Sequence, residues 1–207
     1  SSYTSAGGVI GETNYSTTRA VIADNVVVDV INTNYVGGLV GLYRYASMQH
    51  CYAMNCYISA DRDSKLAETT TLSDVGGLVG LYENTMRWNG AMNTIIDAPK
   101  HSNVGGVVGR LSQSLANNHN IDGCFYLANY DEAVEDEYFL NAANRYTAAA
   151  ISDYYVKGYT NVGGIVGTAR QSTISNSYAD VDIVGKNTIG GIVGEATRGL
   201  VTTSYVK

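Results

Sequence analysis

One motif of six residues recurs six times along the chain and limits it to a repeat fold. Each copy reads Gly-Gly-apolar-apolar-Gly after a small or apolar residue. The copies hold 18 of the 23 glycines, so glycine is used mainly at one place in each unit. They lie at residues 6–11, 36–41, 75–80, 104–109, 162–167 and 189–194. Self-similarity at a period of about 20–50 residues is typical of stacked units, each burying its apolar face against its neighbours.

The distances between the copies define the repeating unit. Counted from the first glycine of each copy, the intervals are 30, 39, 29, 58 and 27 residues, so the unit has 27–30 residues. The 39-residue interval is one unit with about ten extra residues. The 58-residue interval is either one unit with a large insertion or two units, one of them decayed. A small residue followed by Tyr recurs at a fixed offset in three copies, as Cys51-Tyr52, Ser177-Tyr178 and Ser204-Tyr205.

The stretches between the motifs have the composition of short β-strands. They are rich in Val, Ile and Tyr and are bounded by Asn, Ser, Thr, Asp and Gly. Residues 172–178 and 179–184 alternate as strands do. Neither a leucine-rich pattern nor a helical period is present. We therefore predict an all-β chain that forms a right-handed parallel β-helix (β-solenoid) of about six to seven rungs. It forms one domain over residues 1–207, with a large insertion or degenerate rung at about 128–157.

The motif glycines are expected to have a steric role in such a coil. Equivalent residues of successive rungs stack about 4.8 Å apart. A ladder of Gly-Gly pairs lets the backbone bend or pack closely where a Cβ would collide. Of the two apolar ladders between the glycines, at least one must face the core. The glycines assigned to this role are Gly37, Gly38, Gly41, Gly76, Gly77, Gly80, Gly105, Gly106, Gly109, Gly163, Gly164, Gly167, Gly190, Gly191 and Gly194.

The six copies, followed by Asn176-Ser177-Tyr178 or His50-Cys51-Tyr52, resemble the GLUG-motif repeat family. The resemblance covers residues 6–207 apart from the insertion. Members occur in large bacterial surface and secreted proteins, among them adhesin-like proteins and immunoglobulin-A-cleaving metallopeptidases, whose repeats lie outside the catalytic part. The resemblance implies an extracellular or cell-surface setting within a longer protein, and it implies no single activity.

The charge of the chain excludes several classes of partner. The net charge is −6 and the pI is about 4.9, whereas nucleic acids and anionic membranes require a basic face. No uncharged apolar run reaches the roughly 18 residues of a membrane span. We therefore expect no nucleic-acid partner and no direct membrane insertion.

Catalytic motifs are missing from the sequence. There is no phosphate-binding loop, no H-E-x-x-H and no G-x-S-x-G. His119 is placed in the small-residue column of its unit. A β-helix enzyme acting on polysaccharide would need clustered acids, and the candidate pairs are Asp180 with Asp182, Asp61 with Asp63, and Asp24 with Asp29. We expect no catalytic residue, no cofactor and no metal, and we interpret these acids as solvated strand-face residues.

The chain has three cysteines, so at least one thiol is unpaired. Cys56 and Cys124 share an offset two copies apart, which places them roughly 9–10 Å apart at the spacing of strands. A disulfide needs Cα atoms within about 7 Å. We expect Cys51, Cys56 and Cys124 to be reduced and mostly buried.

The irregular 58-residue interval is rich in tyrosine and acidic residues. Insertions in repeat proteins form loops on one face, often the binding face, and tyrosines give rigid contact area to such loops. The alternative is a segment that packs on the solenoid and covers apolar surface. The candidate binding surface comprises Tyr126, Tyr130, Tyr138, Tyr146, Tyr154, Tyr155 and Tyr159.

The expected function is that of a non-catalytic, adhesin-like surface or secreted module that displays loops to a glycan or host glycoprotein and contacts the flanking domains of its parent protein. The first alternative is a purely structural stalk, and the second is a polysaccharide-active enzyme. A binding module predicts exposed tyrosines around the insertion. A stalk predicts that they pack inward, and an enzyme predicts a groove with convergent carboxylates.

Overall fold

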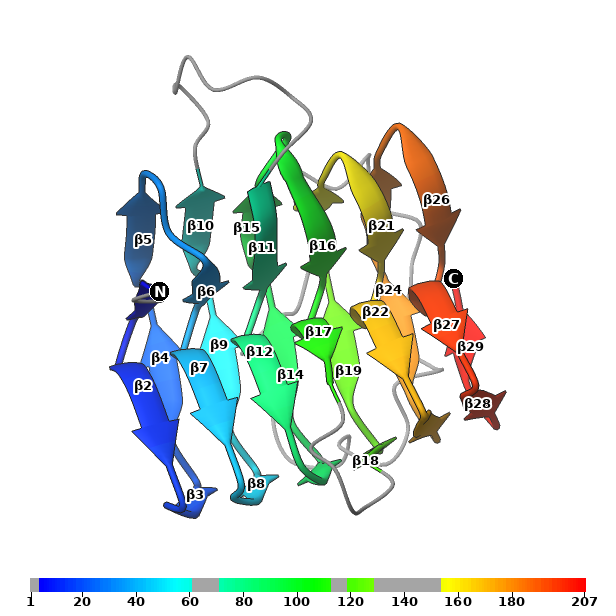
Figure 1. Cartoon of the computed structure of the whole chain (residues 1–207), viewed down its shortest axis with the longest axis horizontal. Coiled ribbons are helices and arrows are strands. Elements are labelled where there is room, and N and C mark those ends of the chain that lie inside the picture. Colours follow the sequence, from blue (N-terminus) through cyan, green and yellow to red (C-terminus); the bar gives the residue numbers. More distant parts are fainter. Residues whose placement is uncertain (1–3, 61–70, 113–118, 129–153) are drawn as a thin grey trace.

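The computed structural model describes residues 4–60, 71–112, 119–128 and 154–207. These residues form strands and turns and contain no helix. The chain coils from left to right in Figure 1, and each turn adds one strand to each sheet. All strand pairs are parallel, as in the pairing of β6 with β1 and β11. The predicted parallel β-helix is confirmed.

Five sheets, named A to E in the order in which one rung visits them, form the faces of the coil. Sheet A contains β1 (Ser5–Gly7), β6 (Tyr35–Gly37), β11 (Thr71–Gly76), β16 (His101–Gly105), β21 (Thr160–Gly163) and β26 (Asn187–Gly190). Sheet B contains β2 (Ile10–Asn14), β7 (Val40–Arg44), β12 (Val79–Glu83), β17 (Val108–Leu111), β22 (Val166–Arg170) and β27 (Val193–Thr197).

The remaining sheets contain shorter strands. Sheet C contains β3 (Thr18–Arg19), β8 (Met48–Gln49), β13 (Met86–Arg87), β18 (His119–Asp122), β23 (Ser172–Ser175) and β28 (Leu200–Thr202). Sheet D contains β4 (Ile22–Asp24), β9 (Tyr52–Met54), β14 (Gly90–Met92), β19 (Phe125–Leu127), β24 (Tyr178–Asp180) and β29 (Tyr205–Val206). Sheet E contains β5 (Val27–Val30), β10 (Tyr57–Ala60), β15 (Ile95–Asp97), β20 (Tyr155–Lys157) and β25 (Asp182–Val184).

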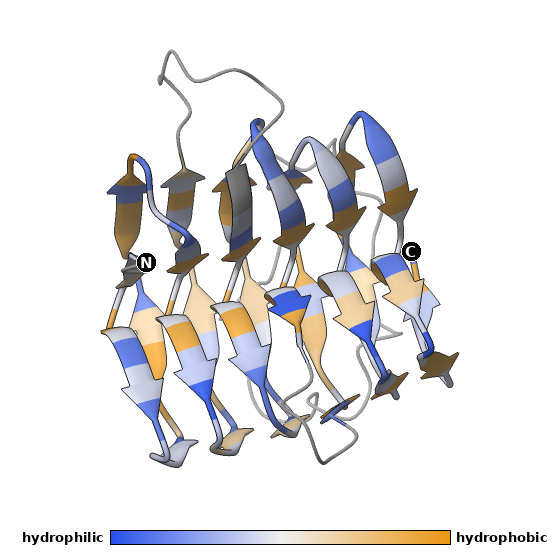
Figure 2. Cartoon of the chain, viewed as in Figure 1, coloured by the Kyte–Doolittle hydropathy of each residue, from blue (hydrophilic) through white to orange (hydrophobic). Residues whose placement is uncertain are grey.

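The core is a set of apolar ladders that run along the coil axis. Figure 2 shows apolar residues recurring at matching levels of successive rungs. In the second to fifth copies, both apolar residues between the motif glycines, such as Leu39 and Val40, are fully buried in the core cluster. Both ladders therefore contribute to the core, which the sequence alone did not decide.

The motif glycines lie where the chain bends from sheet A into sheet B. A Cβ on Gly37 would lie 2.1 Å from the carbonyl oxygen of Val40, and a Cβ on Gly38 would lie 2.3 Å from that of Gly77. A Cβ on Gly80 would lie 2.5 Å from the backbone nitrogen of Val36. The motif requires glycine because backbone occupies the space that a side chain would fill.

The 58-residue interval is a single rung, because β16 to β20 visit the five sheets once. Residues 129–153 lie between β19 and β20. The predicted boundaries of 128–157 were too wide, since Tyr155–Lys157 forms β20 and pairs with β15. Residues 113–118 lie between β17 and β18, and 61–70 lie between β10 and β11.

A residue with positive φ turns the chain between sheets C and D, and a small polar side chain inside the turn follows it. Asn176 occupies the turn with φ 49°, and the Ser177 hydroxyl donates to the carbonyl of Ser175 at 2.8 Å. The Cys51 thiol donates to the carbonyl of Gln49 at 3.3 Å. The recurring small residue is therefore a turn-stabilising donor.

The register corrects two predictions made by counting residues. Tyr52 pairs with Gly90 and Gly90 with Phe125, so Cys124 is equivalent to Cys51 and not to Cys56. His119 pairs with Ser172 and lies outside the small-residue column. Both errors arise because residues 113–118 displace the count in the fourth rung.

All three cysteines are free and buried, as predicted. Burial raises the pKa values of the Cys51 and Cys56 thiols, and it raises that of Cys124 to about 12. These thiols are accordingly protonated and unreactive.

Candidate functional site

The predicted tyrosine surface does not form around Tyr126. This side chain is fully buried, and its hydroxyl donates to the carbonyl oxygen of Thr94. Desolvation raises its pKa. Its neighbours in register are Ala91 and Ala179, and their small side chains leave room in the core for the ring. Tyr126 is therefore a core residue, which corrects its assignment to the binding surface.

The other tyrosines of that set are half-buried or lie outside the described residues. Tyr154 packs against the core cluster, and Tyr155 is half-buried in β20. Tyr159 is half-buried, with the Nζ of Lys186 lying 5.0 Å from its ring centroid. The described ranges do not include Tyr130, Tyr138 and Tyr146.

Two pairs of aromatic rings lie at the turn between sheets C and D, and we call them the aromatic corner. His50 stacks on Trp88 with ring centroids 5.2 Å apart and an interplanar angle of 27°. Tyr52 and Phe125 lie 5.9 Å apart in the adjacent column. Trp88 is 48% exposed, His50 is exposed, and the second pair is half-buried. The corner therefore presents apolar ring surface to solvent.

Glycines in neighbouring rungs make room for these rings. A Cβ on Gly123 would lie 2.6 Å from Cδ1 of Trp88. A Cβ on Gly90 would lie 2.5 Å from Cε2 of Phe125. Each ring thus leans over a glycine of the adjacent strand, as aromatic residues do when they cover strand glycines.

The backbone under the exposed pair is strained. His50 and Trp88 have φ values of 51° and 53°, in the left-handed region. That region costs a residue with a Cβ roughly 1–2 kcal/mol. The equivalent residues of the other rungs, Ala20, Gly123, Asn176 and Thr203, also have positive φ, so the left-handed conformation is a property of this turn in every rung.

Polar side chains lie beside the aromatic corner on sheet C. Arg19, Gln49 and Arg87 occupy one outward column in register. The Nη2 of Arg19 donates to Oε1 of Gln49 at 3.0 Å. Apolar ring surface beside guanidinium and amide donors suits a ligand with one apolar face and several hydroxyls, as a sugar has.

Sequence reasoning missed the aromatic corner because the third rung reaches this turn one residue early. Asn89 lies in the small-residue column at offset 13 from the first motif glycine, whereas Cys51 lies at offset 14. The available signal was that Trp88 is the only tryptophan of the chain.

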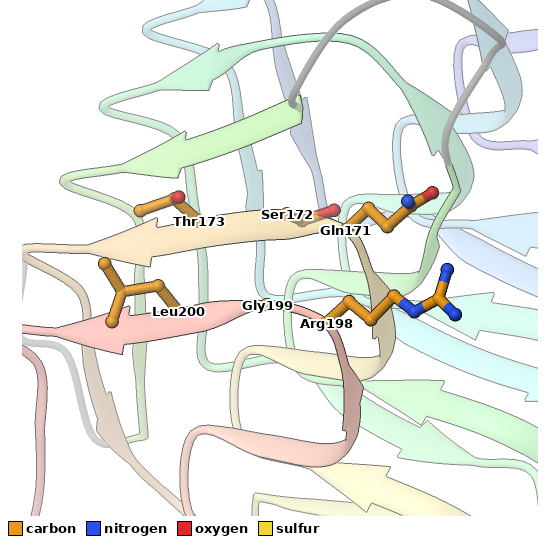
Figure 3. A pocket seen from close by; sticks show the side chains of 6 residues that line it. All are labelled: Gln171, Ser172, Thr173, Arg198, Gly199 and Leu200. Atoms are coloured by element: carbon orange, nitrogen blue, oxygen red, sulfur yellow. The ribbon is translucent and has the colours of Figure 1, made fainter.

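A second surface feature is a hollow at the turn between sheets B and C, in the fifth and sixth rungs. We call it the arginine hollow. Figure 3 shows its lining, with the Gln171 and Arg198 side chains extending to the same side. It has two adjoining parts. One is lined by Arg170, Gln171, Thr197 and Arg198, and the other, drawn in Figure 3, by Gln171, Ser172, Thr173, Arg198, Gly199 and Leu200.

A buried polar ladder fills the outer angle between sheets A and B. Nη2 of Arg110 contacts Asp74 at 2.9 Å. Nδ2 of Asn103 donates to the Asp74 carboxylate at 2.7 Å, and the Thr168 hydroxyl donates to Oδ1 of Asn103 at 2.7 Å. Burial raises the pKa of the Asp74 carboxyl to about 6, although Arg110 and Asn103 act in the opposite direction. The ladder ties four strands together.

The raised pKa of Asp74 makes stability depend on pH. Folding favours the protonated Asp74 carboxyl. This group therefore stabilises the fold fully below pH 3.8, and its contribution is lost as the pH rises through about 6. The loss is about 3 kcal/mol for a shift of this size. Urea unfolding at pH 4 and pH 7 should show a smaller pH effect in Asp74→Asn than in the unsubstituted chain. An equal or larger pH effect in the variant would contradict this assignment.

The remaining candidates for catalysis do not form one site. The Asp24 carboxylate accepts a hydrogen bond from Asn55 at 2.9 Å, Asp29 and Asp182 are exposed, and Asp180 is half-buried. Asp61 and Asp63 lie outside the described residues. His119 is buried, which lowers its pKa. Among the described residues, no group of three His, Cys, Asp or Glu side chains is placed to hold a metal ion.

The fold defines a β-solenoid protein in which each rung repeats one sequence motif. Comparison with protein families matches residues 158–184 to the GLUG motif, and this stretch contains β21 to β25, one complete rung. The predicted resemblance to the GLUG-motif repeat family is thereby confirmed for this rung. No curated protein and no solved structure is significantly similar to the chain. In the described residues, no helix is long and apolar enough to span a membrane.

Proposed function

We propose that the chain is a non-catalytic, adhesin-like module of a secreted or surface-displayed bacterial protein, and that it binds a glycan or glycoprotein through the aromatic corner. The observation that carries the proposal is the exposed stack of Trp88 on His50. The GLUG motif supports the extracellular setting. The proposal moves the binding surface from the predicted tyrosines to the turn between sheets C and D.

The module would act as a rigid platform. The rings belong to the second, third and fourth rungs, so the stacked strands fix their spacing before a ligand arrives. Covering a large side chain contributes about 1.5–3 kcal/mol, so one sugar on Trp88 alone would bind with a dissociation constant of about 6–80 mM. Tight attachment would then come from several copies of the module acting together.

The stalk alternative remains the second candidate, and the burial of Tyr126 favours it. In that account the aromatic corner is a cross-strand ladder that stabilises the coil. The two accounts differ in the expected effect of Trp88→Asn on binding. Its effect on stability should be small in both. Asparagine tolerates the left-handed region but loses the ring stack, which is worth about 0.5–1.5 kcal/mol, so stability should change by less than about 1 kcal/mol.

We expect Trp88→Asn to abolish binding on an array of mucin-type glycans, plant polysaccharides and host glycoproteins, with folding checked by circular dichroism. Tyr15→Asn is the matched control, because Tyr15 is also exposed, also has positive φ and also stacks on an aromatic ring, that of Tyr45. The control should retain every hit. Equal binding by Trp88→Asn and the unsubstituted chain would favour the stalk.

A further inference from the structure

The arginine hollow lies where arginines of two adjacent rungs come together, and the column of one of them, Arg170, carries an acid in an earlier rung. Arg44 and Glu83 are paired in register in sheet B, and Arg44 Nε lies 3.6 Å from the Glu83 carboxylate. The column continues to Arg170, whose partner in register is Thr197. The residue after Thr197 is Arg198, a second arginine. The column thus carries an acid in the third rung, Arg170 in the fifth and Thr197 in the sixth, and Arg198 lies beside it in the next column.

Neither arginine of the hollow contacts an acidic side chain among the described residues, although the charge of Arg170 acts on the Asp74 carboxyl in the direction that lowers its pKa. In the described part of the chain, the salt bridges involve Arg44, Arg110 and Lys157, and neither Arg170 nor Arg198 takes part in one. Both side chains are exposed. Two unpaired cations in adjacent rungs repel each other, in a chain whose net charge is −6. An anion between them would relieve this repulsion.

The lining of the hollow supplies further donors. The Gln171 side chain lies one rung from Arg198 and extends to the same side in Figure 3. Thr173 and Thr197 add hydroxyls at the rim. The Ser172 hydroxyl is already used, since it donates to the carbonyl of Arg170 at 2.7 Å. The part that both arginines line measures about 320 Å³, which is room for one small oxyanion.

We propose that the arginine hollow binds the sulfate or carboxylate group of an acidic glycan. A planar guanidinium presents two parallel N–H donors to an oxyanion, and such charge-assisted pairs are about twice as strong as neutral hydrogen bonds. Sulfate and carboxylate share this chemistry. An acidic glycan is thus the ligand class for the proposed glycan-binding module. Recognition of the sugar rests on that proposed function, whereas recognition of the anionic group rests on the hollow alone.

The test is a calorimetric titration of the chain at low salt with four probes. These are a chondroitin sulfate hexasaccharide, a hyaluronan hexasaccharide that carries carboxylates only, a neutral chitin hexasaccharide, and sodium sulfate. We expect at least one acidic oligosaccharide to bind at least tenfold more tightly than the neutral one. Comparing the first two probes separates sulfate from carboxylate recognition. Affinity should fall as salt is raised, because exposed charges are screened.

Arg170→Gln/Arg198→Gln should weaken binding of the acidic oligosaccharide at least tenfold. Arg44→Gln is the matched control, since it removes a cation from the same column at a position where Glu83 already neutralises the charge. Circular dichroism checks that this variant folds. Its affinity for the acidic oligosaccharide should stay within twofold of that of the unsubstituted chain. An equal loss in the control, unchanged binding by the double variant, or binding of sodium sulfate without either acidic oligosaccharide would overturn the proposal. Trp88→Asn should leave binding of sodium sulfate unchanged, which separates failure of the hollow from failure of the aromatic corner.

Discussion

Gly109→Ala is expected to lower the free energy of unfolding by more than about 4 kcal/mol, the range of severe single substitutions. A Cβ at this position would lie 2.5 Å from the backbone nitrogen of Val75 and 2.7 Å from the carbonyl oxygen of Gly80. Both contacts are with backbone of the preceding rung, which cannot move without breaking the ladder between β12 and β17. Urea or thermal unfolding followed by circular dichroism measures the effect.

Gly11→Ala is the matched control, because Gly11 is the third glycine of its motif as Gly109 is. The nearest atom to a Cβ there is the carbonyl oxygen of Ser5 at 3.5 Å, an ordinary contact. Alanine restricts the conformations of the unfolded chain, so the free energy of unfolding of this variant should rise by up to about 1 kcal/mol. Equal effects at the two positions would show that contact between rungs is not what requires glycine.

Tyr82→Ala is the second substitution with a large expected effect. The ring is fully buried and stacks on Tyr43, with ring centroids 5.3 Å apart. The hydroxyl accepts the Met48 N–H at 3.1 Å and donates to the carbonyl oxygen of Thr85 at 2.7 Å. Removing the ring from a packed core costs about 3–5 kcal/mol, and the orphaned backbone groups add to that.

Tyr82→Phe separates the two contributions. It keeps the ring and leaves the Met48 N–H and the Thr85 carbonyl without this partner, for an expected loss of about 1–3 kcal/mol. The same unfolding measurement applies to both variants. A loss below about 0.5 kcal/mol in Tyr82→Phe would mean that the hydroxyl does not hold the turn between sheets B and C.

The sequence was sufficient to predict the coil, because the motif spacing sets the rung length and each glycine marks the same bend. The motif appears wherever sheet A meets sheet B, and the Cβ contacts at Gly37 and Gly38 show why no other residue fits. A steric requirement repeated in every rung leaves a signal in the sequence that is independent of the residues around it.

The direction of individual side chains could not be predicted, because it depends on the register between rungs. Tyr126 was expected at the surface and is in the core, where its hydroxyl bonds to Thr94. Its inward position follows from alignment with Ala91 and Ala179, which the extra residues 113–118 conceal when offsets are counted from the motif. A different offset hid the proximity of Trp88 to His50, because the third rung reaches this turn one residue early.

The central claim, that a glycan binds at the aromatic corner, is tested most directly by intrinsic fluorescence. Trp88 is the only tryptophan of the chain, so its emission reports on this corner alone. Titration with any glycan that scores on the array should change the tryptophan emission and saturate at the dissociation constant found by calorimetry. Calorimetric binding with no change in tryptophan emission would contradict the claim and place the ligand elsewhere on the chain.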